Sequence, residues 1–130
     1  MTVKKTSVLV LDCAEPEGLA HFYADLLGAE VRAGAGLDMV EVVGGPGVHL
    51  AIRRDLGHAP PSWPRPEDSQ QAHLRIQVAA EDLDEAEREA VSLGARPLDV
   101  DVEDGPRDAR LFSDPAGHSF TLAATGPLRA

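Results

Sequence analysis

The sequence predicts an α+β fold made of two tandem βαβββ modules that form an open, barrel-like cleft. Each half of the 130-residue chain reads as strand, helix, strand, strand, strand. Both predicted helices end on the same tripeptide, Leu27-Gly-Ala29 in the first half and Leu93-Gly-Ala95 in the second. Because element order and helix endings both repeat about half a chain apart, we interpret the sequence as an internal duplication.

The first module is expected over about residues 3–54. Residues 3–12 predict its first strand, since they contain the continuous apolar run Val8-Leu-Val-Leu11. A helix should begin at Pro16, which suits a first helical turn, and end before Gly28. Its apolar residues recur at helical spacing: Leu19, Phe22, Tyr23, Leu26 and Leu27. Three more strands are expected, separated by glycine-rich turns, over residues 29–33, 37–43 and 48–53.

A connector is expected over residues 55–70, which hold four prolines and no strong periodicity. The second module, about residues 71–126, should open with the alternating strand His73–Ala79. This alternation places Leu74, Ile76 and Val78 on one face and His73, Arg75 and Gln77 on the other.

A helix should follow this strand, because Asp82-Leu-Asp-Glu85 has the spacing of a capping box. Its apolar residues, Leu83, Ala86, Ala90 and Leu93, recur at helical spacing, and Gly94 should end it. The last three strands are expected near residues 96–102, 109–113 and 118–124. One domain of two modules should thus span residues 1–130.

The amino-acid composition limits the classes of binding partner and the cellular location that we expect. The chain carries 12 Lys and Arg against 22 Asp and Glu, a formal net charge of −10, which would repel a nucleic acid backbone. No apolar run is long enough for a membrane span, and the start shows no secretory signal pattern. The single cysteine, Cys13, excludes an internal disulfide and a multi-cysteine zinc site. We therefore expect a cytoplasmic protein with no nucleic acid or membrane partner.

Several motifs, taken in order, resemble the vicinal oxygen chelate superfamily, and in particular its glyoxalase-like branch. They are Leu11-Asp-Cys-Ala-Glu-Pro16, Leu19-Ala-His-Phe-Tyr23, Pro61-Ser-Trp-Pro64, His73-Leu74 and Phe112-Ser-Asp-Pro-Ala-Gly-His-Ser-Phe120. The resemblance implies paired βαβββ modules and a homodimer. Its members include glyoxalase I, extradiol dioxygenases, thiol transferases and metal-free bleomycin-type resistance proteins, so fold alone does not decide the activity.

The resemblance also implies a divalent metal held by about four ligands, from the first and last strand of each module. Ser7 and Val8 stand at the first position and supply no credible ligand. His49 and His73 could serve at the next two, and Thr121 occupies the position of the expected glutamate. Two imidazoles without a carboxylate should hold a first-row metal weakly. We therefore expect no resident cofactor and an incomplete metal site, although a metal on His49 and His73 stays open.

Five residues are candidate ligand-binding residues: His49, Trp63, His73, Arg75 and Thr121. Each has a structural alternative. His49 and His73 could be hydrogen-bonded within their sheets, and Trp63 could be a hydrophobic plug instead of an aromatic wall. Arg75 could pair with a carboxylate instead of clamping an anionic or carbonyl-bearing ligand, and Thr121 could be an ordinary strand residue.

These expectations favour a protein that binds a small organic ligand in the cleft between the modules. One alternative is a metal-dependent lyase, isomerase or dioxygenase with a rearranged site that uses His49, His73 and an unidentified carboxylate. Another is a metal-free acid–base enzyme that uses His73. The sequence does not identify a catalytic residue.

Overall fold

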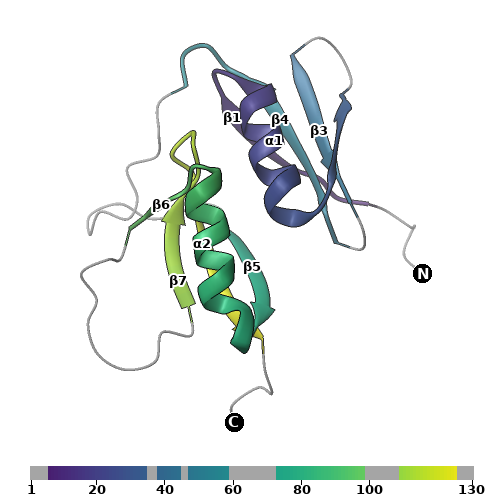
Figure 1. The fold of residues 1–130 in the computed structure, drawn as a ribbon. Helices are drawn as coiled ribbons and strands as arrows, with labels where there is room; N and C mark the ends of the chain where they lie inside the picture. Colours follow the sequence, from purple (N-terminus) through teal and green to yellow (C-terminus); the bar gives the residue numbers. More distant parts are fainter. Residues whose placement is uncertain (1–5, 35–37, 45–46, 59–72, 99–108, 126–130) are drawn as a thin grey trace. The chain divides into compact units, whose positions relative to one another are not determined.

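The computed structural model of the chain describes residues 6–34, 38–44, 47–58, 73–98 and 109–125. The chain divides into two compact units, residues 1–59 and residues 60–130. Each unit contains one four-stranded mixed sheet and one α-helix. Figure 1 labels the two helices α1 and α2. The predicted α+β architecture of two βαβββ modules is confirmed. The cleft between the modules stays a prediction.

The first unit follows the predicted element order. It consists of β1 (Leu9–Cys13), α1 (Pro16–Leu27), β2 (Glu30–Ala33), β3 (Met39–Val43) and β4 (His49–Arg54). The strand order in the sheet is β1-β4-β3-β2. β1 runs parallel to β4, and the other two pairs are antiparallel. The first and last strands of the module are therefore neighbours.

Helix α1 begins and ends where the sequence predicts. Pro16 lies in its first turn, and Gly28 takes the left-handed conformation, with φ of 66°, that ends the helix. The apolar side of α1 is buried against its own sheet, so the packing confirms the helical pattern. The buried helix residues are Pro16, Leu19, Ala20, Phe22, Tyr23 and Ala24.

The second unit repeats this arrangement. Its elements are β5 (Leu74–Ala79), the short 3₁₀-helix η1 (Ala80–Asp82), α2 (Leu83–Leu93), β6 (Arg96–Pro97), β7 (Ala109–Ser113) and β8 (Ser119–Thr125). The strand order is β5-β8-β7-β6, with β5 parallel to β8. The structure thus repeats in the second unit the topology of the first, which supports the internal duplication.

The predicted capping box at the start of α2 is wrong. Asp82 precedes the helix but makes no side-chain capping hydrogen bond. The physical reason is the preceding 3₁₀ turn: Asp82 has φ of −99° and ψ of 0°, whereas a capping side chain needs an extended backbone to reach the free N–H groups. The backbone is thus already helical, in the 3₁₀ turn η1, directly before α2 begins.

The two faces of the second sheet differ in chemistry. The face toward α2 carries the aromatic pair Phe112 and Phe120, which lie opposite each other on β7 and β8 with ring centroids 5.5 Å apart. Arg110 shares that face and bonds to α2. The other face, here called the helix-distal face, carries the alternate residues of each strand: His73, Arg75, Gln77, Arg96, Leu111, Ser113, Ser119, Thr121 and Ala123. The aromatic core lies on the helix side, whereas most of the polar side chains lie on the helix-distal face, which also carries Leu111 and the buried Ala123.

Neither α1 nor α2, the α-helices within the described part of the chain, combines the length and apolar character that crossing a bilayer requires.

Candidate functional site

The helix-distal face of the second sheet brings together three of the five candidate residues. His73 directly precedes β5, and Arg75 lies two residues further along the chain on the same face. Arg75 lies opposite Thr121 in the parallel β5–β8 pair. The alternation that the sequence predicts for residues 73–79 is confirmed by the burial pattern, since Leu74, Ile76 and Val78 are less exposed than Arg75 and Gln77.

His73 lies between two hydroxyl groups of β8. Its Nδ1 is 3.1 Å from Oγ of Ser119, and its Nε2 is 2.6 Å from Oγ1 of Thr121. The pKa of His73 is lowered from its ordinary value of 6.5, chiefly because burial disfavours the charged ring and secondly because Arg75 repels it. The neutral ring has one N–H donor and one acceptor nitrogen. One hydroxyl therefore accepts from the ring while the other donates to it.

Arg75 presents a guanidinium group beside this cluster. Its side chain is exposed, and no described carboxylate lies within salt-bridge distance of it. The structural alternative for Arg75, an ion pair with a carboxylate, is therefore not seen among the described residues. The planar guanidinium offers several N–H donors in a fixed geometry that suits a carboxylate or phosphonate.

His49 is the first residue of β4, an inner strand of the sheet in the first unit. Its Nε2 lies 3.0 Å from Oε1 of Glu41, which comes from the neighbouring strand β3. Both side chains are partly exposed. Sequence reasoning missed Glu41, because it lies eight residues before His49 and meets it only through the β3–β4 register.

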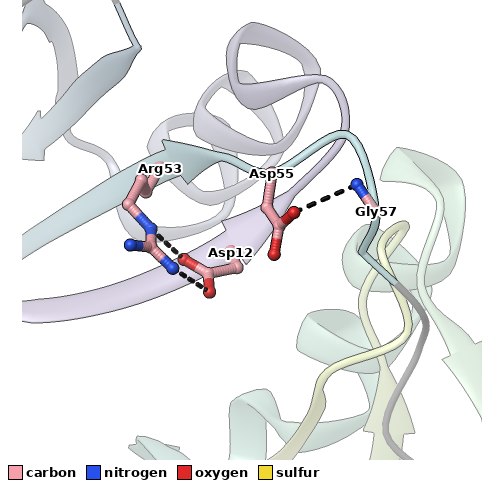
Figure 2. Close-up of polar contacts among 4 residues, drawn as sticks. All are labelled: Asp12, Arg53, Asp55 and Gly57. Carbon is pink, nitrogen blue, oxygen red and sulfur yellow. Dashed lines mark hydrogen bonds and ion pairs between the residues drawn. The ribbon is translucent and has the colours of Figure 1, made fainter.

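An ion pair joins the ends of β1 and β4 in the same unit. Figure 2 shows the two charge-assisted hydrogen bonds from Arg53 to the Asp12 carboxylate, at 2.8 and 2.7 Å. The two residues lie opposite each other in the parallel pair. In the following turn, the backbone N–H of Gly57 donates to Oδ1 of Asp55 at 3.0 Å, as Figure 2 also shows. The carboxylate of Asp12 is thus engaged by a neighbouring strand.

The described donor groups do not fit the divalent ion that the resemblance implies. Val8 offers only an aliphatic side chain, and both ring nitrogens of His73 lie within hydrogen-bond distance of hydroxyls. A neutral hydroxyl such as that of Thr121 is a weak ligand compared with a carboxylate. No three His, Cys, Asp or Glu side chains gather in a metal-binding arrangement within residues 6–34, 38–44, 47–58, 73–98 and 109–125.

Trp63, the remaining candidate residue, lies outside these residues, so its predicted role as aromatic wall or plug stays a prediction.

Comparison with known proteins assigns the chain to a family. The family model described as "Glyoxalase-like domain" matches residues 8–123 of the chain. No protein with a curated description matches it.

Three solved structures illustrate the likeness in fold. A mutant of the fosfomycin resistance protein FosX from Listeria monocytogenes, complexed with Mn(II) and 1S,2S-dihydroxypropylphosphonic acid, gives a TM-score of 0.67 at 18% identity; the match covers 97% of this chain and 94% of that one. A glyoxalase/bleomycin resistance protein/dioxygenase family enzyme from Burkholderia phytofirmans gives 0.68 at 13% identity, covering 91% and 96%. A glyoxalase-related enzyme from Fulvimarina pelagi gives 0.64 at 20%, covering 95% and 89%.

Proposed function

Because the chain belongs to the glyoxalase-like domain family, we propose that it binds a small organic ligand in the cleft between its two modules, with an incomplete metal site. The observation that carries the proposal is the position of His73 between Ser119 and Thr121. Where the resemblance implies a metal held by histidine and glutamate, this chain has a histidine bonded to hydroxyls. Such a cluster suits hydrogen bonding to an organic molecule better than coordination of a cation.

The ligand-binding residues in this proposal are His73, Arg75 and Thr121 from the second unit, His49 from the first, and Trp63 from the connector. The first three share one sheet face, which supports their acting on one molecule. Trp63 would add an aromatic wall.

The FosX complex bears on the proposal only through its fold. In that structure a related fold holds a small phosphonic acid together with Mn(II). At 18% identity this likeness shows the fold alone, so the proposal takes from it only that the fold accommodates small molecules. The proposed homodimer and cytoplasmic location rest on the family resemblance and on composition, respectively.

One observation keeps the metal-dependent enzyme as a second candidate. Glu41 supplies a carboxylate 3.0 Å from His49, and the enzyme alternative requires a carboxylate near that histidine. Elemental analysis of protein purified without chelator separates the two candidates. We expect substoichiometric Ni, Zn, Fe and Mn. A stoichiometric metal that disappears in His73→Ala would overturn the binding proposal in favour of the enzyme.

A thermal-shift screen tests ligand binding directly. The library should contain aromatic metabolites and antibiotics, each at several concentrations. A compound present at 100 times its dissociation constant stabilises the folded protein by about 2.7 kcal/mol. The proposal expects at least one compound whose effect saturates and is weakened in Thr121→Val. A library with no saturable binder would contradict it.

A further inference from the structure

Charge is segregated across the second sheet. The described carboxylates of this unit lie in η1 and α2 or in the turn before β8: Glu81, Asp82, Asp84, Glu85, Glu87, Glu89 and Asp114. The helix-distal face carries Arg75 on β5 and Arg96 on β6, and its described strand residues include no carboxylate. In a chain of net charge −10, the described strand residues of this face thus carry positive charge and no negative charge.

Arg75 belongs to the arginines of the described chain that make no ion pair with a described carboxylate, together with Arg32, Arg88 and Arg96. Three other described arginines do make one. Arg53 pairs with Asp12, Arg54 with Asp38, and Arg110 with Asp84 and Glu87. Arg75 has no such partner among the described residues, yet it lies in register with Thr121, whose hydroxyl is 2.6 Å from His73. A cation that has no counter-ion among the described side chains and lies next to hydroxyl groups offers an anion both charge and hydrogen-bond donors.

We propose that the helix-distal face of the second sheet recognises an organic anion, whose carboxylate, phosphonate or phosphate group binds to Arg75 and to a hydroxyl of the His73–Ser119–Thr121 cluster. The inference rests on the proposed ligand-binding function and gives its ligand a chemical class. It concerns the second unit alone.

The hydroxyl of Thr121 can serve as a donor to an anion. If Nε2 of His73 carries the proton, it donates to Thr121, and Ser119 donates to Nδ1. The Thr121 hydroxyl then accepts from the ring and can donate its own proton to an anion, while Arg75 supplies parallel N–H donors.

Matched pairs of small probes test the ligand class. The probes are benzoate with benzamide, phenylacetate with phenylacetamide, and phenylphosphonate with its dimethyl ester. Each pair keeps the aromatic group and changes the charge. Binding to the full chain is measured by calorimetry and thermal shift. We expect the anion of at least one pair to bind about tenfold tighter than its neutral partner, about 1.4 kcal/mol.

Two variants locate the effect. Arg75→Gln should remove the preference for the anion, and Arg75→Lys should restore part of it. Arg88→Gln is the matched control, because it makes the same charge change on the exposed side of α2, away from the helix-distal face. It should leave the preference unchanged. Circular dichroism confirms that each variant is folded.

The outcomes separate the two proposals. Neutral probes that bind as well as the anions would overturn the anion inference and leave ligand binding standing. An anion preference that persists in Arg75→Gln, or falls equally in Arg88→Gln, would also overturn it. If neither these probes nor the screening library bind, the proposed function fails together with the inference.

Discussion

Nε2 of His73 and Oγ1 of Thr121 lie 2.6 Å apart, although 48 positions separate the two residues in the chain. The contact exists because β5 and β8, the first and last strands of the second module, are parallel neighbours. The resemblance assigned both positions to metal ligands, and the structure shows them bonded to each other. This is the shortest polar contact that the candidate residues make within the described part of the chain.

The Thr121 hydroxyl should contribute measurably to stability. Thr121→Val keeps the shape of the side chain but removes the partner of Nε2, so we expect a loss of about 1 kcal/mol in the free energy of unfolding. Urea denaturation measures it. Thr125→Val is the control, since its exposed hydroxyl bonds a backbone carbonyl of β5 at 3.1 Å and should cost less. Equal losses in the two variants would contradict a special role for the His73 contact.

Stability should fall in acid through His73. Burial and Arg75 hold the pKa of His73 below 6.5 in the folded chain, so the unfolded chain takes up this proton first as pH falls. The contribution of His73 is therefore complete above about pH 7 and is lost as pH falls below 6.5 toward the folded pKa.

Denaturation of wild type and His73→Gln, compared between about pH 8 and pH 5, checks this. The wild type should lose more stability on acidification than the variant. Titration of the ring by NMR gives an independent measurement. A His73 pKa above 6.5 would reverse the predicted sign.

The Asp114 carboxylate should be required for the turn before β8. Its side chain is fully buried, and Oδ1 accepts hydrogen bonds from the backbone N–H groups of Ala116 and His118, each at 2.9 Å. Asp114→Ala leaves both donors without this acceptor, which should cost about 2–3 kcal/mol. Asp114→Asn retains an acceptor and should cost less.

Asp55→Ala provides the comparison for Asp114. Asp55 makes the same kind of bond, to the N–H of Gly57, but in an exposed turn where water can replace it. We expect a loss below about 1 kcal/mol there. Chemical denaturation of the three variants ranks them, and an equal loss at both sites would contradict the argument from burial.

Arg110 should anchor α2 through its stem as well as its charge. Its side chain is 14% exposed and pairs with Glu87 at 2.7 Å and Asp84 at 2.8 Å. Arg110→Ala removes both, and because Asp84 is largely exposed we expect only about 1–2 kcal/mol of destabilisation. Arg110→Met restores the apolar stem and should recover part of it. Arg88→Ala, on the exposed side of α2, should change stability by less than about 0.5 kcal/mol.

Local signals in the sequence predicted the elements well. Pro16 and Gly28 fixed the bounds of α1, and Gly94 ended α2, because these residues act through their own backbone conformation. The capping box failed for a local reason too: the 3₁₀ turn through Asp82 depends on how β5 leads into α2, which the motif does not encode.

The site was predicted less completely, because its contacts depend on strand register. His73, Arg75 and Thr121 were identified as candidates, but their proximity follows from the β5–β8 pairing. The contacts of Glu41 with His49 and of Asp12 with Arg53 cross strands in the same way. A lone carboxylate in a strand gives no sign of the cation it will meet, so sequence patterns alone could not find either pair.

The position of β8 has a consequence for folding order. It is the last strand of its module in the chain, yet it lies between β5 and β7 in the sheet. A nascent chain that ends before residue 119 would leave β5 without its neighbour and Phe112 without its aromatic partner. Truncation there should leave the second unit unfolded, whereas the first unit could already close on the ribosome once β4 has emerged.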